Sequence, residues 1–93
     1  MESKVRKHLY ISGHVQGVGF RWYTNQQANN LGITGWVKNL NDGRVEAVLV
    51  GDKLKVNKMI DLIKQGSPLS EVEDLEIIDE EFQDEFSKFK VKY

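Results

Sequence analysis

Apolar and polar residues alternate near the amino-terminal end of the chain. The apolar positions of one parity are Val5, Leu9 and Ile11. The opposite parity holds Arg6, His8, Tyr10 and Ser12. This period of two predicts a strand with one buried face, although Lys7 interrupts the apolar positions near its start.

A glycine-rich loop and a helix are predicted after this strand. The loop is Gly13-His14-Val15-Gln16-Gly17-Val18-Gly19. From about Arg21 to Leu31 the apolar spacing becomes helical, with one side formed by Phe20, Thr24, Ala28 and Leu31. Gly32 stands where a residue in the left-handed conformation would end the helix.

The middle of the chain predicts a hairpin and a second helix. Strands over Gly35–Leu40 and Arg44–Val50 flank Asn41-Asp42-Gly43, whose residues tolerate the positive φ of tight turns. Asp52 can cap a helix that runs to about Gln65. The apolar stripe of that helix is Val56, Ile60 and Ile63.

The remaining segments complete a recognisable order of elements. Gly66-Ser67-Pro68 ends the second helix, a strand is predicted from Val72 to about Phe82, and a short last strand includes Phe89, Val91 and Tyr93. The order β-α-β-β-α-β with a terminal strand predicts an α+β, ferredoxin-like sandwich. Its two helices should cover one face of a largely antiparallel sheet.

Length and composition limit the class of protein. With 93 residues, we expect a single domain, 1–93. The longest apolar run, Ala47 to Val50, is far too short for a membrane span, and no apolar stretch follows the charged amino end as in a secretory signal. The chain has no cysteine, which excludes disulfides, thiolate nucleophiles and cysteine-based metal sites. We therefore expect a cytoplasmic protein.

Charge is unevenly distributed along the chain. Residues 1–70 hold ten Lys or Arg and five Asp or Glu, whereas residues 71–93 hold three Lys and nine Asp or Glu. All nine acids lie between Glu71 and Glu85. This segment could be an acidic interaction tail, but its interspersed apolar residues favour a solvated strand face and loop. No uniformly basic surface for nucleic acid is indicated.

The loop from Gly13 to Arg21 has the features of an anion site. It connects a strand to a helix start, where backbone N–H groups lack partners and the helix dipole favours negative charge. Glycines allow the left-handed turns of an anion-binding nest. The Arg21 guanidinium can add a bidentate contact to phosphate or carboxylate. A purely structural turn remains an equal alternative on this segment alone, because neither dinucleotide-binding nor Walker spacing is present.

Two motifs resemble those of the acylphosphatase family. The first is Gly13-x-Val15-Gln16-Gly17-Val18-Gly19-Phe20-Arg21. The second is Gly35-Trp36-Val37-Lys38-Asn39-Leu40-x-Asp42-Gly43-x-Val45-Glu46, closing on Gly51. Their order and spacing match without a gap, and the resemblance extends over essentially the whole chain.

The resemblance implies hydrolysis of acyl phosphates to a carboxylate and inorganic phosphate. It implies that Arg21 binds phosphate and that Asn39 holds the attacking water. The phosphate would also bind the backbone amides of a loop made of Val15, Gln16, Gly17, Val18, Gly19, Phe20 and Arg21. Phosphate would be product and inhibitor, with no metal and no cofactor. We expect a monomer that binds neither nucleic acid nor membranes.

Other roles for the same chain are less favoured. A ferredoxin-like sheet can bind RNA through aromatic residues on its central strands, but Arg44 to Val50 contains none. A non-catalytic phosphate-binding relative is a second alternative, which intact Arg21 and Asn39 argue against.

The remaining polar and aromatic candidates are expected to be structural. A catalytic triad is not indicated: His8 and Ser12 are four residues apart on one strand, and we expect His8 on the sheet face and His14 exposed on the loop. Trp36 is expected to anchor a core or a pocket rim. The aromatics expected to serve packing are Tyr10, Trp22 and Tyr23.

Overall fold

The structure, a computed structural model, describes residues 3–93. Its elements are β1 (Lys4–His14), α1 (Phe20–Leu31), β2 (Thr34–Asn39), β3 (Val45–Asp52), α2 (Lys53–Gln65), β4 (Glu71–Glu80) and β5 (Phe89–Lys92). Within the described residues, neither helix is long and apolar enough to cross a membrane.

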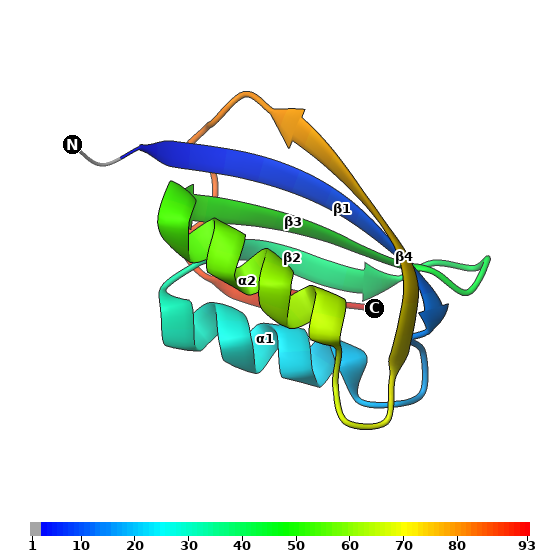
Figure 1. Cartoon of the computed structure of the whole chain (residues 1–93). Helices are drawn as coiled ribbons and strands as arrows, with labels where there is room; N and C mark the ends of the chain where they lie inside the picture. The colour runs from blue at the N-terminus through cyan, green and yellow to red at the C-terminus, as the bar shows by residue number, and fades with distance from the viewer. Residues whose placement is uncertain (1–2) are drawn as a thin grey trace.

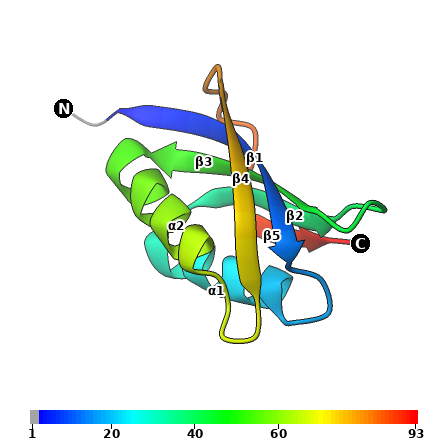
Figure 2. The same ribbon diagram turned by 45° about the vertical axis from the view of Figure 1, so that its right-hand side comes forward.

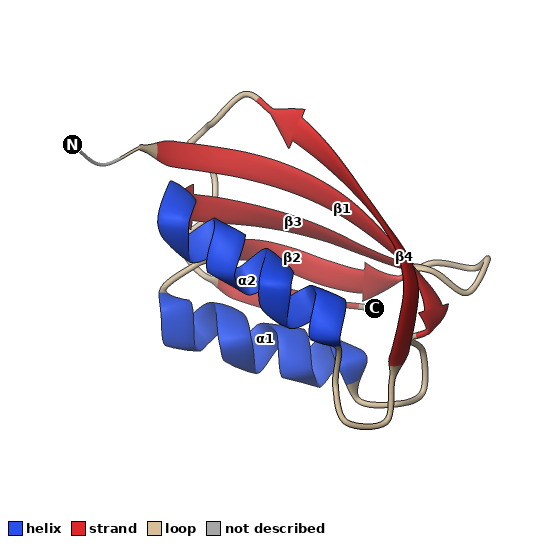
Figure 3. Cartoon of the chain, viewed as in Figure 1, coloured by secondary structure: helices blue, strands red, loops and turns tan. Residues whose placement is uncertain are grey.

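The five strands form one sheet in the order β4-β1-β3-β2-β5. β1 pairs antiparallel with β3 and β4, and β2 pairs antiparallel with β3. Both helices lie on the same face of this sheet (Figures 1 and 3). The turned view in Figure 2 shows β4 crossing the sheet obliquely at its edge. The predicted ferredoxin-like α+β fold is confirmed. The short last strand is present too, and it pairs in parallel with β2.

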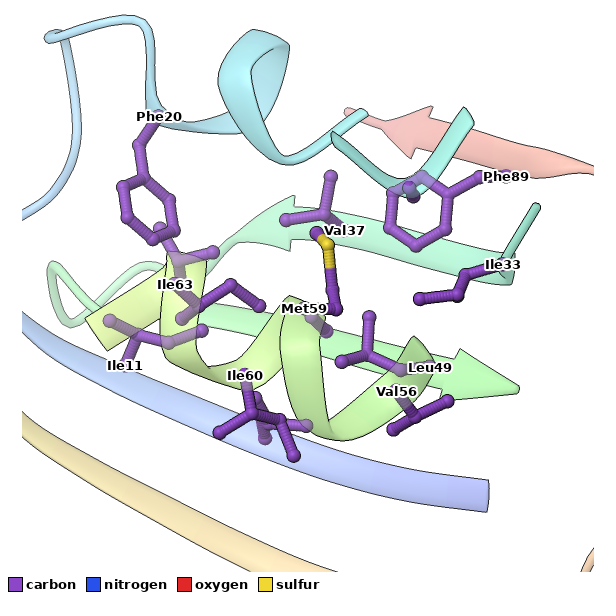
Figure 4. Packing of buried hydrophobic residues seen from close by; sticks show 14 of the residues in the cluster. Ile11, Phe20, Ile33, Val37, Leu49, Val56, Met59, Ile60, Ile63 and Phe89 are labelled. Atoms are coloured by element: carbon purple, nitrogen blue, oxygen red, sulfur yellow. The ribbon is translucent and has the colours of Figure 1, made fainter. Parts of the chain in front are cut away.

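Apolar side chains between the helices and the sheet form the core. Figure 4 shows Phe20 of α1 and Ile63 of α2 directed toward Ile11 of β1. Farther along, Met59 lies among residues of β2 and β3, including Val37. Each fully buried side chain of this kind contributes about 1.5–3 kcal/mol relative to an exposed one. The core therefore fixes the start of α1 against the strands, which matters for the loop that precedes it.

Local signals account for most element ends. Asp52 caps α2, its side chain accepting hydrogen bonds from the N–H groups of Leu54 and Lys55, and Gly32 ends α1 in the left-handed conformation. The side chain of Asp42 in the hairpin turn accepts a hydrogen bond from the N–H of Arg44 and contacts its guanidinium, which lowers the pKa of the Asp42 carboxyl.

β1 is longer than the alternation predicts. It continues to His14 because β4 pairs with its end after a register irregularity between Ser12 and Gly13. Such a bulge shifts the side-chain alternation, so the period of two ends before the strand does.

The acidic segment forms an exposed edge strand and a connection. Most of its side chains are exposed, as expected for a solvated strand face and loop. Residues 81–88 then join β4 at one edge to β5 at the other, behind the sheet as seen from the helices in Figure 1. Arg6 of β1 forms ion pairs with Glu80 and Glu85, which hold this connection against the helix-free face.

Gly35 is required by a close approach between two strands. Its φ is +135°, and a Cβ at this position would overlap the carbonyl oxygen of Val48 on β3. We expect Gly35→Ala to lower the free energy of unfolding by about 3 kcal/mol, because it adds an overlap to an unfavourable φ. Urea unfolding measures this loss. Gly43→Ala is the matched control: its φ is +95°, but a Cβ there meets no atom within 4 Å. It should lose only about 1 kcal/mol, and equal losses would contradict the role of the overlap.

Candidate active site

One hollow brings together the glycine-rich loop, the start of α1, the end of β2 and the carboxyl-terminal segment. Its volume is about 210 Å³. The lining residues are Val15, Gly17, Gly19, Phe20, Arg21, Trp22, Asn39, Val91 and Tyr93. Segments far apart in sequence therefore meet at a single site.

The start of α1 leaves its backbone donors available. Gly19 occupies the capping position with φ 76°, makes no side-chain cap, and is followed by no acidic residue in the first turn. Gly17 is also left-handed, with φ 73°. Within residues 3–93, none of the backbone N–H groups of residues 16–20 donates a hydrogen bond to a backbone carbonyl. Such N–H groups at a helix start favour an anion.

The loop is fixed from several directions. Val15 and Phe20, at its two ends, are each 1% exposed and belong to the core. The Gln16 side-chain amide donates to the carbonyl oxygens of Leu40, at 2.7 Å, and of Arg44, at 2.9 Å. On the other side, Ser67 Oγ donates to the carbonyl oxygen of Val18 at 3.2 Å. These contacts pre-organise the loop before any ligand binds.

Arg21 is oriented by the carboxyl-terminal segment. Its Nη1 donates to the carbonyl oxygen of Lys92 at 3.3 Å. Its guanidinium carbon lies 4.8 Å from the centre of the Tyr93 ring, in the geometry of a cation–π contact. The side chain is half-buried and lines the hollow. Among residues 3–93, one guanidinium donor is thus used, and the remaining donors can bind a ligand.

Asn39 presents an amide to the same hollow. It is the last residue of β2 and pairs with Val45 of β3, directly before Leu40, whose carbonyl binds Gln16. Its Oδ1 is buried and accepts no hydrogen bond within the described residues. A buried polar oxygen without a protein partner is uncommon and points to a ligand or a bound water. The Gln16 contacts bring this amide and the loop to one place.

The structure places most, but not all, of the predicted site residues on the hollow. Asn39 and five loop residues line it. Gln16 and Val18 do not: the Gln16 side chain is turned to the hairpin, and the Val18 side chain is packed against the core. Gln16 and Val18 would contribute to the predicted phosphate site through their backbone amides.

Three lining residues were missed by the sequence analysis: Trp22, Val91 and Tyr93. The expectation that Trp22 serves packing is wrong, because this side chain is 67% exposed. Its position directly after Arg21 in the sequence could have indicated that Trp22 borders the site. Val91 and Tyr93 gave no such signal, because no pattern revealed that the last strand pairs with β2.

The prediction for His8 is confirmed, and the prediction for His14 is confirmed in its exposure alone. His14 is exposed as predicted, but it is the last residue of β1 and does not belong to the loop. His8 lies on the sheet face, where Nε2 is 2.6 Å from a carboxylate oxygen of Glu46 and Nδ1 is 3.1 Å from one of Glu80. Neither histidine lines the hollow.

Gln16→Ala tests the connection between the loop and the hairpin. Losing two hydrogen bonds should lower the free energy of unfolding by about 2 kcal/mol. Because the loop and Asn39 would lose their common anchor, we also expect kcat/KM for the acyl phosphates that the sequence resemblance implies to fall about tenfold. Urea unfolding and steady-state kinetics measure the two effects. Gln65→Ala, at the exposed end of α2, is the control and should change neither. Full activity of Gln16→Ala would show that the anchor is unnecessary.

Comparisons with known proteins show the family of the chain. The sequence model described as Acylphosphatase matches residues 7–91. An acylphosphatase of Syntrophobacter fumaroxidans is 50% identical over 90 residues, which cover 97% of this chain and 93% of the relative. The crystal structure of acylphosphatase from Bacillus subtilis superposes with a TM-score of 0.92 at 32% identity, covering 96% of this chain and 99% of the other. An acylphosphatase structure from Coxiella burnetii gives a TM-score of 0.90 at 34% identity, with 96% and 93% coverage. The chain therefore belongs to the acylphosphatase family of hydrolases.

Proposed function

We propose that the chain hydrolyses the carboxyl–phosphate bond of acyl phosphates, with phosphate held by the amides of residues 15–21 and by Arg21, and with water oriented by Asn39. One observation carries this assignment. An uncapped helix start, a guanidinium and an unpartnered amide oxygen all border the same hollow. Membership in the acylphosphatase family supports the reaction class.

The reaction needs few groups. The water oxygen attacks phosphorus, and the bond between phosphorus and the acyl oxygen breaks. The electron pair leaves with a carboxylate, which is stable unprotonated near neutral pH, so no general acid is required. The proton of the attacking water passes to a phosphate oxygen of the substrate. Inorganic phosphate and the carboxylate are the products.

The loop and Arg21 would stabilise the negative charge of the phosphoryl group. As the phosphoryl group transfers, negative charge is spread over its three equatorial oxygens. Fixed N–H dipoles and one guanidinium facing those oxygens stabilise this charge without reorganising. The pre-organisation comes from the anchors of the loop, Val15, Gln16 and Phe20. Arg21 would supply positive charge directly.

Asn39 would position the water rather than deprotonate it. An amide accepts no proton near neutral pH, but its oxygen accepts and its NH₂ group donates hydrogen bonds. Holding the water in line with the leaving oxygen converts a bimolecular encounter into an oriented attack. The buried Oδ1 of Asn39 provides the acceptor for this contact.

A metal-free assay tests the proposal. The purified chain in EDTA should hydrolyse benzoyl phosphate and release inorganic phosphate, with added phosphate acting as a competitive inhibitor. A chain that binds phosphate but does not turn over would instead be a binding domain of the same fold. Binding of single-stranded RNA without hydrolysis would favour the sheet-face alternative.

A further inference from the structure

Two aromatic side chains lie at the mouth of the hollow, and the phosphate site gives no role to one of them, Trp22. Trp22 is 67% exposed and Tyr93 is 100% exposed, yet both line the hollow. Large exposed aromatics add nothing to the core, and when they border a cavity they indicate a binding surface. Trp22 therefore needs an explanation beyond packing, and Tyr93 adds aromatic surface to the same mouth besides its contact with Arg21.

The position of Trp22 on α1 strengthens this point. Its neighbours Phe20 and Thr24 are buried, so Trp22 points away from the core that α1 covers. A polar residue would satisfy the amphipathic pattern of α1 equally well there. Tyr23, in contrast, has a structural role, because its hydroxyl donates to the carbonyl oxygen of Leu62 at 3.2 Å. Trp22 has no contact of this kind among the hydrogen bonds of the described residues.

The chemistry of the lining divides the hollow into two parts. The polar part consists of the loop amides, Arg21 and Asn39, which suit a phosphoryl group. Trp22, Val91 and Tyr93 supply apolar or aromatic surface. Among the described lining residues, Arg21 is the only charged one. Nothing in this lining besides Arg21 would pair with a second anionic group on the substrate.

We infer that Trp22 and Tyr93, with Val91, bind the acyl group of the substrate and favour uncharged aromatic acyl phosphates over short ones. This inference rests on the proposed function, since it assigns the part of the hollow that phosphate does not use. An aromatic acyl group can stack on an indole or phenol ring and bury apolar area there, whereas an acetyl group is too small to do either. Trp22 is then a specificity-determining residue.

The test compares two substrates in matched variants. We measure kcat/KM for benzoyl phosphate and acetyl phosphate in the wild-type chain, Trp22→Ala, Trp22→Phe and Leu54→Ala. Leu54 is a suitable control because it is 78% exposed and does not line the hollow. The ratio of the two losses cancels differences in intrinsic substrate reactivity. Circular dichroism checks that each variant is folded.

We expect Trp22→Ala to lower kcat/KM for benzoyl phosphate about tenfold, and that for acetyl phosphate by less than about threefold. Trp22→Phe should restore most of the loss, and Leu54→Ala should change neither value. Equal losses with both substrates, or no loss, would overturn the acyl-group assignment alone. Failure of the wild-type chain to hydrolyse either substrate would overturn the proposed function and this inference with it.

Discussion

Arg21→Gln is expected to lower kcat/KM for an acyl phosphate by about 10³-fold or more. Glutamine removes the positive charge that would face the phosphoryl oxygens, and its side chain ends two atoms short of the guanidinium Nη atoms. The contact with the carbonyl oxygen of Lys92 is lost as well, because the glutamine amide does not extend as far as Nη1. A variant that keeps the charge is therefore needed to separate the effect of charge from the effect of the Lys92 contact. Inhibition by inorganic phosphate should weaken sharply as well.

Two further arginine variants sharpen this result. Arg21→Lys keeps the charge but not the planar pair of donors, and should recover only part of the activity. Arg44→Gln makes the same chemical change at a hairpin residue that does not line the hollow, and should leave activity intact. Steady-state kinetics with phosphate as inhibitor measures all three. Unchanged phosphate inhibition in Arg21→Gln would remove Arg21 from the phosphate site.

Asn39→Ala is expected to lower kcat about 10²-fold while phosphate inhibition stays near its wild-type value. The two effects separate because Asn39 would hold the water, whereas the loop and Arg21 would hold the phosphate. Loss of an oriented nucleophile lowers the rate of the chemical step without removing the groups that bind the anion. This pattern is the opposite of that expected for Arg21→Gln, in which rate and phosphate inhibition fall together.

The Asn39 experiment needs a stability check. Removing a strand-end amide typically costs about 1 kcal/mol, so urea unfolding should show a folded variant. Asn30→Ala, at an exposed position of α1, provides the same substitution away from the hollow and should be fully active. An Asn39→Ala enzyme with wild-type turnover would rule out the water-positioning role.

The elements that could be predicted were those with a local physical cause. The helical spacing around Ala28 and the left-handed Gly32 define α1, and the side chain of Asp52 defines the start of α2. The hairpin follows from Asn41-Asp42-Gly43 in the same way. These features depend on neighbours in sequence, so the pattern contains the information needed.

The features that escaped prediction depend on contacts between distant segments. The last strand showed its alternation, but its parallel pairing with β2 follows from the connection across the helix-free face. Gln16 could be assigned only a backbone amide, because nothing in the sequence indicates that its side chain reaches Leu40 and Arg44. Trp22 was assigned to packing because spacing alone does not distinguish a covered aromatic from an exposed one.

The position of β5 places part of the candidate site at an edge of the sheet. This strand is four residues long and forms one edge of the sheet, and such elements detach at a lower free energy than the core. Yet it supplies Val91 to the hollow, and its last residue supplies the carbonyl that orients Arg21. Fraying of this edge would abolish turnover in molecules whose helices and central strands remain folded. Activity in mild denaturant therefore reports on how firmly the final strand is docked. We expect activity to decline at lower denaturant concentrations than the circular dichroism of the helices.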